Sequence, residues 1–338
     1  MPDQAFTSCR YDVTHEAIQE LGEHESHNDS VYFNFVGPLD RGIAGGVIRI
    51  GLRPNEGYGE ASVVVPLAGG GTVFHYVRTP ISVAEFKVGS PVWESGPLRL
   101  ECVDPTRQWR LRYRGSEARR IEDTTAFARE PGVTWRSSQT LDVEFDLDWQ
   151  AEFPVHVLSR DGSLLPDQES SDMVYGKHHL EQFGRITGTM RLGDDTIAIK
   201  EAPSFRDHSW GPRIWESAPD QDFVTVYLES GLRVAAIANR IDGLESFHGI
   251  WFSPGDTTPT QIDRYELRTA YAGQESAAPV GWTFGAGDTR VDVEGEVVGY
   301  LPLRVGKKTV RIAQTILQLS PDMPGQAKTD LTRPVREG

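Results

Sequence analysis

The chain has 338 residues, of which 38% are hydrophobic and 25% are charged. This length and composition exclude a disordered, fibrous or peptide-sized protein, and they fit two ordinary domains or one large β architecture. The formal net charge of −15 argues against nucleic acid or an anionic membrane as a partner, because both require clustered Lys and Arg.

The N-terminal residues lack a basic segment followed by an apolar run, and no stretch of the sequence approaches the ~20 apolar residues of a membrane helix. We therefore expect a cytoplasmic protein without membrane insertion. The two cysteines, Cys9 and Cys102, are too few for a disulfide framework or a thiolate metal cage, so we expect reduced, structural thiols.

In chain order, residues 14–24 (THEAIQELGEH) form the best helical candidate, with Thr14 as the N-cap and Gly22 near the end. Most of the remaining signal is period-two alternation, which is typical of strands with one wet face. It is clearest in residues 140–150 (TLDVEFDLDWQ). Similar runs occur at residues 45–52, 61–67, 81–88, 98–103, 108–114, 223–229, 232–238 and 308–319.

Many strands at hairpin spacing, without interleaved helices, predict an all-β fold of two antiparallel β-barrels, because closure of a barrel removes exposed edges. Residues 159–173 (SRDGSLLPDQESSDM) are polar and lie near the midpoint of the chain, so they form the natural linker. We therefore predict two domains with few helices, over residues 1–165 and 166–338, and place the motif at residues 206–211 (RDHSWG) in the second.

The segment at residues 176–188 (GKHHLEQFGRITG) places His179 and Glu181 on one face of an extended chain and His178 on the other. A metal site is weakly supported, because a mononuclear catalytic site usually needs three protein ligands and no HExxH-type spacing occurs here. We expect these side chains to orient other groups, and we expect neither a metal nor another cofactor.

Residues 205–213 (FRDHSWGPR) concentrate titratable and aromatic side chains. In an extended chain Arg206, His208 and Trp210 project from one face, and Asp207 and Ser209 from the other. A structural interpretation is an Arg–Asp pair at a turn with a core histidine. A catalytic one uses the imidazole as a proton carrier and the indole for cation stabilisation. A serine nucleophile elbow is disfavoured, because the motif lacks its strand–turn–helix context.

The run at residues 223–230 (FVTVYLES) directs Tyr227 and Glu229 to the same side of a strand. If that side faces an apolar interior, the surroundings keep Glu229 protonated, as a general acid requires. If it faces solvent, Glu229 is an ordinary charged strand residue.

Four stretches together resemble one known superfamily: residues 31–36 (VYFNFV), 47–61 (VIRIGLRPNEGYGEA), 178–192 (HHLEQFGRITGTMRL) and FRDHSWGPR. The chain resembles the carotenoid 1,2-hydratases (hydroxyneurosporene synthases) and AttH-like proteins, and most closely a bacterial branch largely without an assigned reaction. The resemblance implies two packed lipocalin-like barrels around a mostly apolar ligand cavity. It also implies a catalytic His-x-Trp pair and a Tyr-x-Asp pair, in which Glu229 here replaces the Asp.

These observations lead to a cofactor-independent enzyme as the first hypothesis. It would be a hydratase or dehydratase, lyase, isomerase or cyclase for an apolar terpenoid, steroid-like or aromatic substrate. Glu229 or Asp207 would protonate a double bond, Trp210 and Tyr227 would stabilise the cation, and His208 would activate water. The residues expected to bind substrate or orient these groups are Arg206, His179, Glu181 and Trp215.

The second hypothesis is a non-catalytic carrier or sensor of a lipid or terpenoid, because lipocalin-like barrels often only bind. In that case FRDHSWGPR is a structural corner.

A pericyclic cyclase, in which a shaped cavity folds a polyene, would tolerate loss of Glu229, whereas a hydratase would not. The expected partner is a small apolar molecule, and a homodimer is left open.

Overall fold

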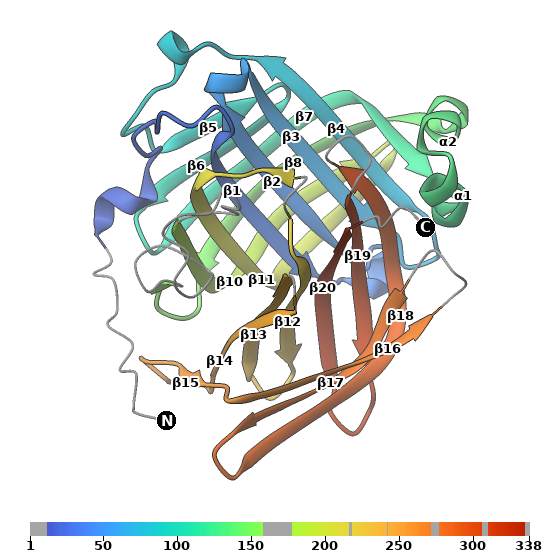
Figure 1. Ribbon diagram of the computed structural model, residues 1–338. Coiled ribbons are helices and arrows are strands. Elements are labelled where there is room, and N and C mark those ends of the chain that lie inside the picture. The colour runs from blue at the N-terminus through green and yellow to red at the C-terminus, as the bar shows by residue number, and fades with distance from the viewer. Residues whose placement is uncertain are drawn as a thin grey trace.

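The computed structural model describes residues 12–157, 178–215, 218–241, 243–271, 277–305 and 310–334. It contains two antiparallel sheets, of 11 and 9 strands, and few helices (Figure 1). The prediction of an all-β fold built on two antiparallel sheets is confirmed.

The first sheet closes into a ring. Its path runs β4-β3-β2-β1-β11-β10-β8-β7-β6-β5, and β4 also pairs with the far end of β7, which joins the path onto itself. The short strand β9 pairs with β10. The strands are β1 (His27–Val36), β2 (Gly45–Arg53), β3 (Tyr58–Pro66), β4 (Thr72–Pro80), β5 (Val92–Ser95), β6 (Leu98–Asp104), β7 (Gln108–Ile121), β8 (Gln139–Ala151), β9 (His156–Val157), β10 (His178–Leu192) and β11 (Asp195–Pro212).

The second sheet is an open half-barrel with the order β15-β14-β13-β12-β20-β19-β18-β17-β16. It lies against the outside of the ring (Figure 1). The strands are β12 (Asp220–Leu228), β13 (Arg233–Ile241), β14 (Leu244–Phe252), β15 (Thr260–Gln261), β16 (Arg264–Tyr271), β17 (Ala277–Ala286), β18 (Thr289–Val305), β19 (Val310–Leu319) and β20 (Gly325–Pro334).

The boundary between the sheets differs from the predicted domain boundary at residues 165 and 166. Strands β10 and β11 belong to the first sheet, where β11 pairs with β1, so the division falls between Pro212 and Asp220. The RDHSWG motif is therefore part of the ring. Periodicity marks strands but not their partners, which is why the polar segment 159–173 looked like the division; it lies outside the described residues.

The predicted helix at residues 14–24 is wrong beyond its first turn. Only a 3₁₀ helix, η1 (Val13–Glu16), forms there, and its N-cap is Asp12 instead of Thr14. The chain then turns extended because its backbone finds other partners: the amide of Ile18 donates to the carbonyl of Ser90 at 2.9 Å, and that of Gln19 to Asp29 at 2.8 Å.

Other helices are short. They are α1 (Thr124–Arg129), α2 (Pro131–Ser137), and the 3₁₀ turns η2 (Leu39–Arg41), η3 (Pro54–Glu56) and η4 (Val83–Glu85). The last of these replaces the strand predicted at residues 81–88, because Ser82 and Glu85 form a capping box that begins a helical turn. Among the described residues, no helix has the length and apolar character needed to cross a membrane.

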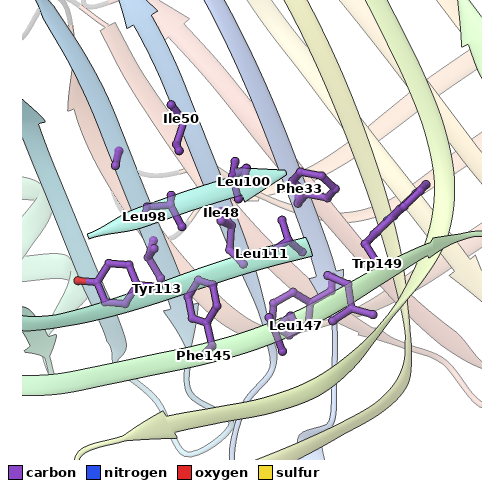
Figure 2. Close-up of a cluster of buried hydrophobic side chains, with 14 of the residues drawn as sticks. Phe33, Ile48, Ile50, Leu98, Leu100, Leu111, Tyr113, Phe145, Leu147 and Trp149 are labelled. Carbon is purple, nitrogen blue, oxygen red and sulfur yellow. The ribbon is translucent and has the colours of Figure 1, made fainter. Parts of the chain in front are cut away.

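Apolar side chains fill the ring. Phe33, Leu111 and Leu147 are fully buried there and point toward one another from β1, β7 and β8 (Figure 2). The predicted alternation of β8 is confirmed, since its apolar side chains face this core. Cys102 lies in the same cluster, and burial raises its pKa to about 12, as suits a structural thiol. Cys9 lies outside the described residues.

A second apolar layer joins the two sheets. It combines outward-facing side chains of the ring, such as Phe183 and Phe205, with Phe223 and Phe252 from the second sheet. The outer face of β1, β11 and β10 is therefore covered by protein. Both faces of these three strands can hold buried functional groups.

Candidate functional site

The strands β1, β11 and β10 lie side by side, and their alternation divides the predicted site residues between two faces. In an antiparallel sheet, residues directly opposite each other project from the same face. Asp207 is opposite Tyr32 on β1 and Glu181 on β10, whereas His208 is opposite Val31 and Leu180. The first set faces the second sheet, and the second set faces the interior of the ring.

On the inner face, His208 is completely buried and fixed by two hydrogen bonds. Its Nε2 lies 3.0 Å from Asp29 Oδ1, and its Nδ1 lies 2.8 Å from the carbonyl oxygen of His15. Both ring nitrogens therefore face an oxygen of the protein. Neither nitrogen is then available to activate a water molecule. Trp93 also donates to Asp29 Oδ1, at 2.8 Å.

Arg206 is also on the inner face and is buried. It donates to Glu16 at 2.5 Å and to Gln182 at 2.9 Å, and its guanidinium lies 5.3 Å from the ring centres of Trp109 and Trp149. The predicted Arg206–Asp207 pair therefore does not form, because neighbouring residues of a strand point to opposite faces.

Trp210 lies at the end of the inner face. Its ring centre is 4.8 Å from that of His208 and 5.4 Å from that of His15. The His-x-Trp pair is thus a packed unit within the ring.

The outer face of the same strands lines an intersheet cleft. The cleft is open to solvent and has a cavity volume of about 120 Å³. It is lined by Ser30, Tyr32, Arg49, His179, Asp207, Ser209, Arg213, Trp215, Gln221, Phe223, Ile237, Ile312, Gln314, Asp330 and Thr332. Three predicted residues, His179, Asp207 and Trp215, are among them.

An acid–base group in this cleft consists of Asp207, His179 and Glu181. His179 Nε2 lies 3.5 Å from Asp207 Oδ2, and its Nδ1 lies 3.8 Å from Glu181 Oε1. The side chains are 15%, 10% and 3% exposed in the order named. His179 and Glu181 share a face as predicted.

The pKa values of Glu181 and His179 are shifted in ways that suit proton transfer. Burial raises the pKa of Glu181 to about 7; His179 opposes this shift and Asp207 adds to it. Burial lowers the pKa of His179, but Asp207 and Glu181 outweigh this effect, so the net pKa lies above its usual value. An imidazolium between two carboxyl groups can give a proton, and a neighbouring carboxylate can accept one.

A second polar group occupies another wall of the cleft, and the sequence analysis missed it. The Tyr32 hydroxyl donates to Asp330 at 3.2 Å, and Asp330 also pairs with the buried Lys328 ammonium. Burial and the charge of Asp330 raise the pKa of Tyr32. Burial lowers the pKa of Lys328, with Asp330 opposing the shift. The packing of β20 in the second sheet against β1 in the first brings these residues together, so no local pattern marks them.

Two further histidines lie behind the acid–base group. His156 on β9 and His248 on β14 stack with Nε2 atoms 3.1 Å apart, and burial lowers their pKa values to about 4 and about 3. They are therefore neutral near pH 7. Within the described ranges, no group of three or more His, Cys, Asp or Glu side chains could hold a metal ion.

Tyr227 and Glu229 lie apart from the acid–base group. Tyr227 is buried between the sheets, where its hydroxyl donates to Asn34 at 2.5 Å, and burial raises its pKa. Glu229 follows the last residue of β12 and is exposed in a turn, so of the two alternatives for this residue the solvent-facing one holds. The strand ends one residue too early to carry Glu229 inward. The structure therefore separates the His208–Trp210 pair inside the ring from Tyr227 between the sheets and from the exposed Glu229.

The fold and the cleft define a class of protein: an all-β chain of two antiparallel sheets with a cleft lined by titratable side chains between them. The chain belongs to the family described as Domain of unknown function (DUF7064), whose model matches residues 12–326. No curated protein sequence gives a significant match.

Several solved structures share this fold. An AttH-like protein from Nitrosomonas europaea aligns with a TM-score of 0.62 at 12% identity, over 93% of this chain and 95% of that one. Kievitone hydratase from Nectria haematococca aligns at 0.53 and 10% identity, over 93% of each chain. CghA aligns at 0.52 and 10% identity, over 93% of this chain and 90% of that one. At these identities the likeness establishes the fold alone.

Proposed function

We propose that the chain is a cofactor-independent enzyme that adds water to, or removes it from, a small molecule bound in the intersheet cleft. The observation that carries this proposal is the line of Asp207, His179 and Glu181, with His179 Nε2 at 3.5 Å from Asp207 and Nδ1 at 3.8 Å from Glu181. The name of one structural neighbour, kievitone hydratase, agrees with such a reaction.

The reaction divides between the two residues that line the cleft. In hydration, the His179 imidazolium gives its proton to one carbon of a double bond, and water attacks the other carbon. Asp207 takes the proton that the water releases and returns it to His179, which restores the starting state. Dehydration follows the same steps in reverse. General acid–base catalysis of this kind contributes about 10²–10⁴-fold to the rate.

The remaining walls suit a largely apolar substrate. Trp215, Phe223, Ile237 and Ile312 provide aromatic and aliphatic surface. Such walls exclude water from the reacting bond and stabilise developing positive charge by their π faces. In this scheme Asp207 accepts a proton from water, whereas the sequence analysis considered it as the acid that protonates the double bond; His208 and Trp210 maintain the ring.

The test uses a small-molecule extract of the source cells, incubated with the purified chain in isotopically labelled water. We expect a product that carries the labelled oxygen to accumulate with the unaltered chain. Asp207→Asn and His179→Gln should lower its rate by about 10²-fold or more. Glu229→Gln, an exposed acid-to-amide change, is the matched control and should leave the rate unchanged. Equal rates in all four proteins would contradict the proposal.

A non-catalytic carrier is the second candidate, and one observation favours it: the predicted His-x-Trp pair serves the interior of the ring and not the cleft. A carrier would retain a ligand from the extract, seen by native mass spectrometry, and would release it chemically unchanged. Asp207→Asn would then alter affinity alone.

A further inference from the structure

A continuous chain of hydrogen bonds crosses the outer face of β2, β1 and β11. Arg49 Nη2 lies 3.5 Å from Asn28 Oδ1, and Asn28 Nδ2 donates to Ser30 Oγ at 3.0 Å. The hydroxyls of Ser30 and Ser209 are 3.1 Å apart, and Arg213 Nη2 donates to Ser209 Oγ at 2.9 Å. Two guanidinium groups therefore flank a pair of hydroxyl groups.

This polar chain opens into the cleft. Arg49, Ser30, Ser209 and Arg213 all line it, and Asn28 beneath them is buried. Ser209 is directly opposite His179 in the pairing of β10 with β11, so the chain adjoins the acid–base group.

A glycine at position 51 leaves space for the Arg49 side chain. Gly51 on β2 is directly opposite Ser30 on β1. A Cβ added at Gly51 would lie 2.8 Å from Arg49 Nη2 and 2.9 Å from Asn28 Oδ1. Any larger residue there would displace the Arg49 side chain. Glu60 holds Arg49 from the other side, with its oxygen 2.7 Å from Nη1.

We propose that this arginine–serine chain binds a carboxylate of the substrate, so that the ligand is an amphipathic acid. Guanidinium groups and hydroxyls are matched donors for a carboxylate, and Arg binds such groups in a planar, two-bond geometry. The apolar body of the acid lies against Phe223, Ile237 and Ile312 on the second sheet. The inference rests on the proposed function for the reaction, but it concerns binding alone.

Charge favours a carboxylate over a phosphate. The cleft also holds Asp207 and Asp330. Repulsion by these two carboxyl groups rises with the charge of the ligand, so a singly charged anion is accepted more readily than a doubly charged one.

The experiment compares two fluorescent probes with the same body, 1-pyrenebutyric acid and 1-pyrenebutanol, by anisotropy at pH 8. We expect the unaltered chain to bind the acid about tenfold or more tightly than the alcohol. Arg213→Gln and Arg49→Gln should each bring this ratio close to one. Arg41→Gln is the control, because Arg41 is 65% exposed and pairs with Asp40 outside the cleft lining.

Equal binding of acid and alcohol by the unaltered chain would overturn the proposal, as would an unchanged preference in Arg213→Gln. Should either arginine variant fail to fold, competition decides: acetate should displace the bound acid from the unaltered chain better than inorganic phosphate does at equal ionic strength. The reverse order would contradict a carboxylate site. Asp207→Asn should keep the preference for the acid, so loss of turnover and loss of acid binding can be told apart.

Discussion

The two faces of β11 make opposite use of one short motif. On the inner face, His208 and Arg206 are hydrogen-bonded to partners inside the ring. On the outer face, Asp207 and Ser209 line a cleft and approach His179 and Arg213. Side chains that are hydrogen-bonded inside the ring stabilise the fold, whereas those that line the cleft can contact a bound molecule.

The comparison also explains why residues that look alike in sequence have different roles. Asp29 and Asp207 are both acidic residues on adjacent strands. Asp29 is fully buried and accepts hydrogen bonds from Trp93, His208 and the backbone of Gln19. Asp207 has one imidazole partner at 3.5 Å and is 15% exposed. The first carboxylate is a structural centre, and the second lines the cleft, where we propose that it acts on the substrate.

The largest expected effect tests this contrast directly. Asp29→Ala removes the acceptor of three hydrogen bonds and leaves their donors unsatisfied, and such a loss lowers the free energy of unfolding by about 3–5 kcal/mol. Asp207→Asn on the opposite face keeps the shape of the side chain and should cost about 1 kcal/mol or less. Urea unfolding of both variants measures the difference. Equal destabilisation by the two changes would break the distinction between the faces.

A smaller effect sharpens the description of the outer face. Glu181 has a folded-state pKa of about 7 against an ordinary value of 4.5, so the folded protein binds more protons than the unfolded chain between these pH values. The free energy of unfolding should therefore fall as pH rises from about 4.5 through about 7. Above pH 7 the ionised, buried carboxylate carries its full cost.

Glu181→Gln cannot ionise, so it should be more stable than the unaltered chain at pH 8 by on the order of a few kcal/mol. The advantage should shrink toward pH 5. Urea titrations across this range give the free energy of unfolding of both proteins as a function of pH. Glu229→Gln is the control, because it also removes one carboxylate from the chain but does so at an exposed position. Parallel curves for the Glu181 variant and the unaltered chain would contradict a buried acid at this position.

Local patterns in the sequence were sufficient for the strands and for the division of FRDHSWGPR between two faces. The alternation of residues 140–150 matches β8, and Asp207 does project opposite to His208. Such patterns carry no information on which face meets the second sheet, because that depends on the pairing of β11 with β1, far away in the chain. The cleft therefore could not be placed before the structure.

The burial of Asp29 follows from the alternation of β1, although its partners do not. Extending the alternation of residues 31–36 backward by two positions places Asp29 on the same face as Val31 and Phe33, which marks a buried carboxylate. Its partners remain beyond prediction, since Trp93 and His208 come from separate parts of the chain. The hydrogen bond from the backbone amide of Gln19 to Asp29 also overrides the helical propensity of residues 14–24.

The smallest expected effect concerns the residue on which the hydratase resemblance placed its acid. Glu229 lies one residue beyond the end of β12, in an exposed turn, and its backbone amide donates to the carbonyl of Pro324 at 2.9 Å. Glu229→Gln leaves that backbone contact in place, so the free energy of unfolding should change by less than ~0.5 kcal/mol. The rate of labelled product formation should not change either, because Asp207 and His179 hold the proton-transfer groups in the intersheet cleft. A large loss of rate with unchanged stability would return the reacting centre to the end of β12. It would also mean that the outer face of β11 only binds the ligand.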